Sequence, residues 1–166
     1  VNLPKSNKMM KPRYQEISQS KILSGTTKDG NITVKVIAGE SLGGKAVIDT
    51  ITPIIYLHFK LEPGSKIVQP VSEDYNVFAY VINGKGLFEQ SNDSNKIIER
   101  GNLVIFDKDG KEIYIQATED SEVPLELLLI GGIPLREPIA RYGPFVMNTQ
   151  QEIYQAIEDY RSGRLG

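Results

Sequence analysis

The sequence predicts an all-β domain, built as a sandwich or closed barrel, with one helix at its C-terminal end. About eight to ten short apolar runs, separated by turn signals roughly every 8–12 residues, follow one another from residue 31 onward. No alternation of strands with helices accompanies them, so a parallel α/β sheet is not expected. The 166-residue length fits a single domain with its own core.

The first expected strands carry the clearest patterns. Residues 32–36 alternate apolar and polar side chains, as a half-buried strand does, and residues 53–61 place apolar side chains on one face. Residues 77–82 form a continuous apolar run, typical of a central strand. Asn83-Gly84 follows at once and predicts a tight hairpin.

Shorter strands are expected at residues 96–99, 103–106 and 112–117. Residues 125–130 (LELLLI) are ambiguous, because their periodicity suits a helix as well as a strand. The Gly131-Gly132 pair and the surrounding β pattern favour a strand.

The C-terminal segment changes period. Thr149 and Glu152 have the spacing of a capping box, and Gly163 is placed to end the helix. The apolar stripe at helical spacing consists of Ile153, Ala156, Ile157 and Tyr160. We therefore expect an amphipathic helix in residues 148–166, a barrel in residues 17–147 and a linker in residues 1–16.

Composition excludes several kinds of function. The net charge of −2 argues against a general nucleic-acid binder, and no stretch has the 18 or so apolar residues of a membrane span. Without cysteine the sequence has no disulfide or thiolate metal site, and with one histidine, His58, it cannot supply a three-histidine site. We expect His58 to lie at the surface, opposite the apolar face of its strand. The absence of a secretory segment in these residues predicts a cytoplasmic location.

Some segments resemble a known family. Pro63-Gly64, residues 77–86 (VFAYVINGKG) and residues 101–106 (GNLVIF) are similar to the two motifs of cupins, which are double-stranded β-helix (jelly-roll) barrels. The match narrows to the C-terminal cupin of pirins through the strings KMMKPRYQE at 8–16, IAGE at 37–40 and RYGPFVMNT at 141–149.

The resemblance implies that the metal chemistry belongs to a different domain from the one in this chain. Pirins have two cupin domains, and three histidines and a glutamate of the N-terminal one hold iron. Some pirins oxygenate flavonols, and a vertebrate member is a transcription co-regulator. The first residue here is valine, and residues 1–4 resemble the end of that N-terminal domain, so we expect a fragment, a processed product or a chain whose non-AUG start codon is written as valine. Iron is then expected only in the absent domain, and no cofactor in this chain.

The general cupin spacing can be laid on this sequence. The two histidine positions fall on Pro70 and Ser72, the glutamate position on Val77 and the last histidine position near Glu112. One carboxylate does not make a first-row metal site, so no metal ligands are expected.

Two other residue sets are candidates for binding. Tyr56, Tyr80 and Tyr114 could line a pocket in the barrel, although tyrosines more often lie in the core or at the rim of a barrel than in a ligand pocket. Contacts with another domain are expected from Met9, Met10, Phe145 and Met147.

Three functions follow as expectations. The first is a metal-free structural or binding module, half of a two-domain pirin. The second is the accessory half of an iron-dependent, quercetin-type dioxygenase, active only with an N-terminal cupin. The third, transcription co-regulation, rests on the family resemblance alone. Either a pirin-like N-terminal cupin or a second copy in a homodimer is the expected partner, docked on an exposed apolar patch.

Overall fold

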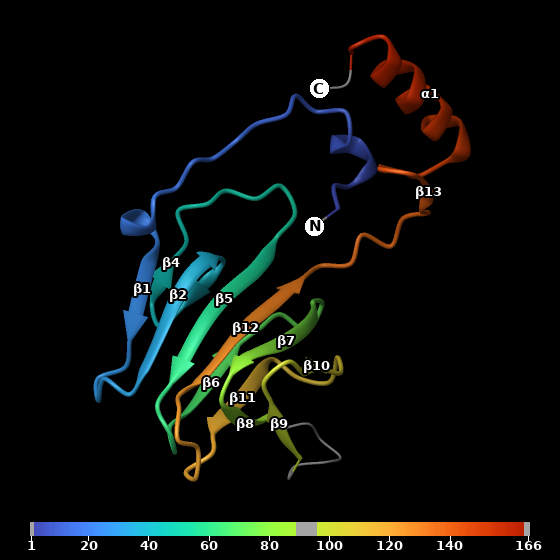
Figure 1. Cartoon of the computed structure of the whole chain (residues 1–166). Helices are drawn as coiled ribbons and strands as arrows, with labels where there is room; N and C mark the ends of the chain where they lie inside the picture. The colour runs from blue at the N-terminus through green and yellow to red at the C-terminus, as the bar shows by residue number, and fades with distance from the viewer. Residues whose placement is uncertain (1, 89–95, 165–166) are drawn as a thin grey trace. The chain divides into compact units, whose positions relative to one another are not determined.

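The computed structural model describes residues 2–88 and 96–164, so Val1 and the last two residues of the expected helical segment lie outside it. The chain divides into two compact units (Figure 1). Residues 16–134 form the first, which we call the barrel. Residues 1–15 and 135–166 form the second, which we call the clasp. Residues 135–147 thus group with the C-terminal helix and the N-terminal segment.

The described part of the barrel consists of strands and one short 3-10 helix, η2 (Gln19–Lys21). Its strands are β1 (Leu23–Thr26), β2 (Ile32–Ala38), β3 (Glu40–Ser41), β4 (Gly44–Lys45), β5 (Ile54–Leu61), β6 (Lys66–Pro70), β7 (Asn76–Asn83), β8 (Lys85–Phe88), β9 (Ile97–Glu99), β10 (Leu103–Ile105), β11 (Glu112–Ala117) and β12 (Leu125–Gly132).

Two antiparallel sheets face each other in the barrel. The large sheet has the order β1-β2-β5-β12-β7-β10, and the small sheet has the order β6-β11-β8-β9. A separate two-stranded ribbon joins β3 and β4. This confirms the all-β, jelly-roll class predicted from the sequence.

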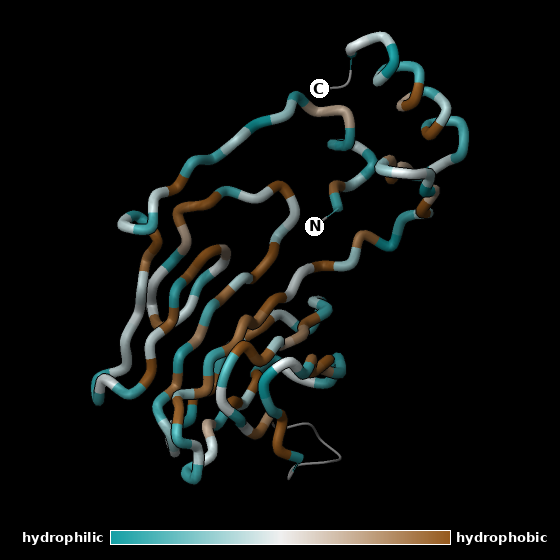
Figure 2. The backbone as a smooth tube through the Cα atoms, viewed as in Figure 1, coloured by the Kyte–Doolittle hydropathy of each residue, from teal (hydrophilic) through white to brown (hydrophobic). Residues whose placement is uncertain are grey.

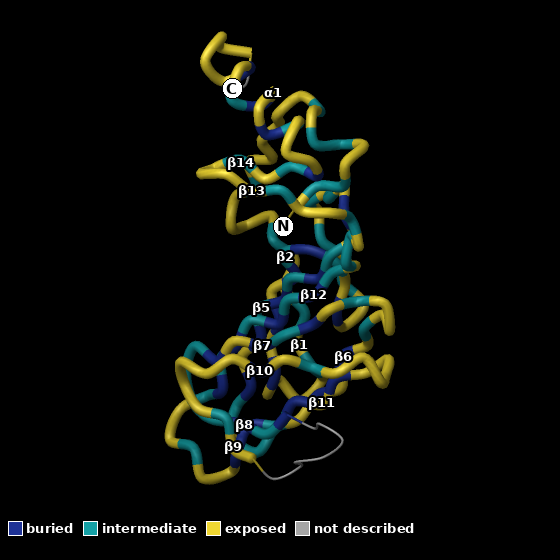
Figure 3. The backbone as a smooth tube through the Cα atoms, turned by 90° about the vertical axis from the view of Figure 1, so that its right-hand side faces the viewer, coloured by how far each residue is buried: buried dark blue, intermediate teal, exposed yellow. Residues whose placement is uncertain are grey.

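Strict alternation builds the core between the sheets. On β5 and β12, every second side chain is buried, and the neighbours between them point outward. The buried positions appear as dark segments along these strands in Figure 3, and many of them are hydrophobic in Figure 2. Side chains with no exposed surface include Leu57, Phe59, Leu61, Leu125, Leu127 and Leu129. Each contributes about 1.5–3 kcal/mol through burial, which is enough to hold the sheets together.

Most strand predictions are confirmed. The runs at 32–36, 53–61, 77–82, 112–117 and 125–130 become β2, β5, β7, β11 and β12. The ambiguous run at 125–130 is the central strand of the large sheet, paired with β5 on one side and β7 on the other. Strands β1 and β6 were not predicted, since they are short and weakly apolar.

The hairpin predicted at Asn83-Gly84 is wrong. Strand β7 belongs to the large sheet and β8 to the small one, so the chain turns a corner between sheets here. Gly84 has φ +70°, and a Cβ at this position would lie 2.5 Å from the carbonyl oxygen of Pro124. The glycine is therefore required by a close backbone approach from a distant loop, which a dipeptide pattern cannot reveal.

The clasp contains η1 (Lys5–Asn7), the hairpin β13 (Ala140–Tyr142) and β14 (Phe145–Met147), and the helix α1 (Gln150–Arg161). The predicted capping box is confirmed, because Thr149 accepts from the Glu152 amide while the Glu152 carboxylate accepts from the Thr149 amide. The helix ends in a Schellman motif around Gly163, which has φ +72°. Of the helices among the described residues, none has the length and apolar character needed to cross a membrane.

Candidate functional site

The positions of the cupin metal ligands can be followed from strand to strand. Pro70 on β6 lies directly opposite Glu112 on β11, and both side chains are exposed. Ser72 lies in the loop after β6 and is also exposed. Only Val77, at the start of β7, is buried in the core. Three of the four positions therefore point to solvent.

The buried side chain on β6 at this end is Gln69, one residue before Pro70. Its carbonyl oxygen accepts a hydrogen bond from the Ser41 hydroxyl at 2.7 Å. Its amide nitrogen donates to the backbone oxygens of Glu40 and Pro70 at 3.3 and 2.9 Å. The bonds to Ser41 and Glu40 tie β6 to the β3–β4 ribbon, so this polar group serves structure.

These residues do not fit an iron site. Val77 and Ile113 carry no donor atoms in their side chains, and the polar atoms of Gln69 are engaged within the protein. Among residues 2–88 and 96–164, no three histidine, cysteine, aspartate or glutamate side chains are grouped so that they could hold a metal ion.

A cavity of about 360 Å³ nevertheless opens at this end of the barrel. We call it the mouth cavity; it lies between the loop after β6, the β10–β11 loop and the first residues of β11. Of the candidate tyrosines, Tyr114 lines it, and its hydroxyl donates to the Glu112 carboxylate at 3.0 Å. Tyr75 also lines the cavity, and the structure adds Phe106, which was not singled out in the sequence.

Tyr56 and Tyr80 lie elsewhere, on the outer face of the large sheet. Strand pairing aligns them with other apolar side chains in two rows across β5, β12, β7 and β10. We call these the outer rows: Tyr56, Ile130, Phe78 and Ile105 form one, and His58, Leu128, Tyr80 and Leu103 form the other.

The outer rows are open to solvent at the β7–β10 side. Ile105 is 70% exposed, Leu103 53% and Tyr80 41%. The side chains further along the rows are half-buried. With strands about 4.8 Å apart, the rows cover a patch roughly 15 Å wide. Apolar runs such as residues 125–130 predict a strand covered on both faces, whereas Tyr80, Leu103 and Ile105 on the outer face of this sheet are exposed.

His58 occupies the other end of its row, as expected opposite the buried face of β5. Its Nε2 lies 2.8 Å from an oxygen of Glu126 on β12, and both side chains are partly exposed. The pair borders the apolar patch with a polar, directional contact.

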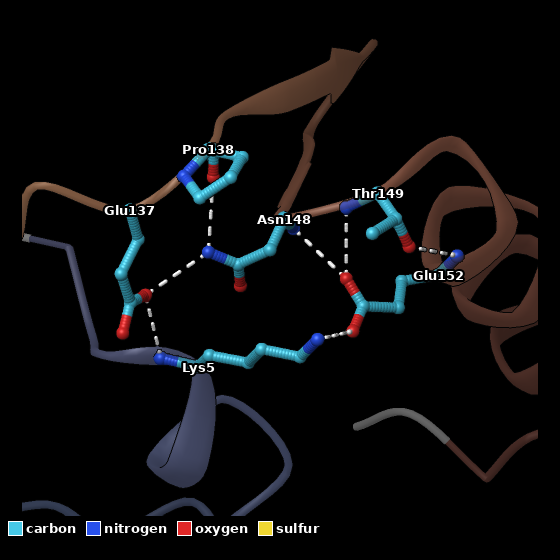
Figure 4. Close-up of polar contacts among 6 residues, drawn as sticks. All are labelled: Lys5, Glu137, Pro138, Asn148, Thr149 and Glu152. Atoms are coloured by element: carbon cyan, nitrogen blue, oxygen red, sulfur yellow. Dashed lines mark hydrogen bonds and ion pairs between the residues drawn. The ribbon is translucent and has the colours of Figure 1, made fainter.

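Polar contacts organise the clasp (Figure 4). The backbone N–H of Lys5 donates to the Glu137 carboxylate at 2.8 Å, and the Lys5 ammonium lies 3.4 Å from Glu152. The buried Asn148 amide donates to Glu137 and to the Pro138 carbonyl, both at 3.0 Å. These contacts join the first residues of the chain to the start of α1.

Two carboxyl groups of the clasp are held in their charged form. Partial burial opposes this at Glu152, but hydrogen bonds from Asn148 and Thr149 and the nearby Lys5 ammonium lower its pKa below the usual value. A hydrogen bond from Arg164, and another from Gln155, lowers the pKa of Asp159. The clasp therefore depends on ionised side chains.

The four residues expected to contact another domain all lie in the clasp. Met9 is 61% exposed, whereas Met10, Phe145 and Met147 are half-buried. The Phe145 ring meets the Tyr160 ring edge-on, with centroids 6.0 Å apart. Phe145 thus packs within the clasp, and Met9 is the most available of the four.

The chain as a whole is similar to proteins of one family. Residues 56–166 match the family model described as the pirin C-terminal cupin domain. The chain is 42% identical to a pirin-like protein of Solanum lycopersicum and 41% identical to pirin of Homo sapiens; each match covers all of this chain and 55% of the relative. It therefore spans about half the length of these relatives.

A solved structure also matches this chain over part of its own length. Quercetin 2,3-dioxygenase from Acinetobacter baumannii superposes with a TM-score of 0.86 at 32% identity, over 100% of this chain and 55% of that one.

Proposed function

Since the chain belongs to the pirin family and carries that family's C-terminal cupin domain, we propose that it is a structural and binding module. It docks a second cupin domain through the outer rows of the large sheet. It performs no redox chemistry of its own. The observation that carries this proposal is the exposed apolar patch centred on Tyr80, Leu103 and Ile105.

The length of the relatives and the apolar outer face of the sheet both favour a second cupin domain as the occupant of the patch. Nearly half of each long relative lies outside the match to this chain, so the relatives contain a further segment of similar size. Apolar side chains on both faces of β7 and β12 are what a strand between two packed layers needs. The core supplies one layer, and a second cupin domain would supply the other.

The His58–Glu126 pair supports a specific register. Apolar contacts are non-directional, whereas a polar pair at the edge stabilises one alignment of the partner and destabilises others. Its position at one end of an outer row fits the polar rim of a protein interface.

Co-expression tests the docking. We would express this chain with the part of the tomato pirin-like protein that it does not match, as a separate polypeptide, and purify by a tag on one of them. We expect a stoichiometric complex, and loss of it in the Leu103→Glu/Ile105→Glu double variant. Val68→Glu is the matched control, because Val68 is 43% exposed on the small sheet, away from the outer rows.

Three outcomes contradict the proposal. One is no complex with the unmodified chain, and the second is a complex that survives the double variant. A concentration-dependent homodimer that excludes the second domain would assign the patch to another copy of this chain.

The metal-free part of the proposal has its own test. The interior residues Gln69, Val77 and Ile113 offer no set of free ligand atoms. We therefore expect far less than one iron per chain by elemental analysis after expression in iron-rich medium. Stoichiometric iron, nickel or zinc would refute it.

A second candidate function is favoured by the likeness to quercetin 2,3-dioxygenase, which extends over the entire chain. In that case the chain is the accessory half of an iron-dependent enzyme. Iron held by the second domain would supply the oxygen activation, and this chain would wall the pocket and exclude water. Quercetin loss should then occur only with the complex, and activity of the isolated chain would contradict this division.

A further inference from the structure

The mouth cavity has an apolar floor. Val77 and Ile113 are buried beneath it, and Tyr75 and Phe106 pack against the core beside them. Tyr114 stands at its rim. A cavity of about 360 Å³ with three aromatic residues suits a single-ring ligand, since small-molecule sites begin at roughly this volume.

The rim of the cavity is acidic. Asp107, Asp109 and Glu112 contribute carboxylates, while Lys108 contributes one ammonium group. Glu73 also lines the cavity, but it pairs with Lys111 at 2.8 Å. This leaves three carboxylates against one ammonium, so the rim attracts a cation and repels an anion.

The carboxylates are available to a ligand. Asp107 and Asp109 line the cavity, and both residues are exposed to solvent. The aromatic residues add to the preference, because a cation over a tyrosine or phenylalanine ring is attracted to the ring face. The described rim does not group these carboxylates as metal ligands, so an organic cation fits better than a metal ion.

From this combination we propose that the mouth cavity binds a small aromatic amine. The ring would lie on the floor formed by Val77, Ile113 and Phe106. The ammonium group would face Asp107, Asp109 and Glu112 at the rim. This site is separate from the outer rows, so it does not depend on the docking proposal.

Tyramine is a suitable probe, because it combines one ring with one ammonium group. We would titrate it into the full chain and follow the amide resonances of residues 106–114 by NMR. Saturable shifts confined to the cavity are expected, and they should weaken with added salt. 4-Hydroxyphenylacetate has nearly the same shape with the opposite charge, and 4-ethylphenol has none. Both should bind more weakly.

Variants separate charge from shape. Asp107→Asn/Asp109→Asn should weaken tyramine binding about fivefold, because each exposed carboxylate contributes modestly. Glu122→Gln removes a carboxylate that does not line the cavity and should leave binding unchanged. Phe106→Leu should weaken tyramine and 4-ethylphenol alike.

Two results would overturn the proposal. One is the absence of saturable shifts with tyramine, and the other is equal binding of the anionic probe. The co-purification assay above is unaffected by these variants if the two sites are separate, so failure here and failure of docking can be told apart.

Discussion

Different forces stabilise the barrel and the clasp. The barrel encloses a continuous core of buried aliphatic and aromatic side chains. In the described part of the clasp, the buried side chains are Ile153, Ala156, Asn148 and Asp159, and two of these are polar. Burial of apolar surface responds little to pH, whereas networks of carboxylates and amides respond strongly. We therefore expect the barrel to be the more stable unit and the clasp to open separately.

The largest expected effect comes from the barrel core. Leu127 is fully buried at the centre of β12, between β5 and β7. Leu127→Ala should lower the free energy of unfolding by about 3 kcal/mol in urea titrations. Leu128→Ala, on the outer face of the same strand, should lower the free energy of unfolding by less than about 1 kcal/mol. Equal losses would show that the outer face is packed as tightly as the core.

The second-largest loss of stability is expected at Gly84, where the chain passes from the large sheet to the small sheet. Gly84→Ala places a Cβ against the Pro124 carbonyl at a positive φ, and we expect a loss of about 2–3 kcal/mol. Gly101→Ala has a similar φ of +85° but meets no atom within 4 Å, so about 1 kcal/mol is expected. If urea titrations showed equal losses for the two variants, the close approach of the Pro124 carbonyl to Gly84 would contribute nothing to the loss of stability.

A smaller and more local effect is expected in the clasp. Asn148→Ala removes the amide that joins Glu137 to the Pro138 carbonyl and should cost about 1–2 kcal/mol of local stability. Hydrogen exchange at the Lys5 amide should accelerate while the barrel midpoint stays unchanged. Gln151→Ala, an exposed helix position, is the control. A drop in barrel stability would contradict the separation of the two units.

Acid should open the clasp before the barrel. The pKa of Glu152 is lowered in the folded state, so its stabilisation is fully present above the unfolded value of about 4.3. It is lost as the pH falls from there through the lowered pKa. We expect the protection of the Thr149 amide against exchange, measured relative to its intrinsic exchange rate at each pH, to fall below about pH 4. Glu152→Gln should flatten this pH dependence, and an unchanged profile in that variant would assign it to another group.

The core strands and the helix were predictable because their signals are local. Alternation in residues 53–61 defines one buried face, and the capping box at Thr149 defines the start of α1. The corner at Gly84 was not predictable, because the atom it must avoid belongs to Pro124. Motif spacing placed a ligand position on Pro70 of β6, whereas the inward-pointing side chain beside it is Gln69, which the spacing alone does not reveal.

The clasp and the outer rows depend on distant pairs. Lys5 and Glu137 are 132 positions apart, so no local pattern connects them. The outer rows did leave a trace in the sequence, since residues 77–82 and 125–130 are apolar on both faces. Such a run indicates a strand with apolar contacts on both faces, and only the fold shows which residues of the outer face are exposed.

Thiol labelling tests the docking face most directly. The chain has no cysteine, so Leu103→Cys and Val68→Cys each provide a single thiol, one in the outer rows and one on the small sheet. We predict that co-expression with the second cupin domain protects the thiol introduced at position 103 from a maleimide and leaves the one at position 68 reactive. Full reactivity at position 103 within the purified complex would contradict docking through the outer rows.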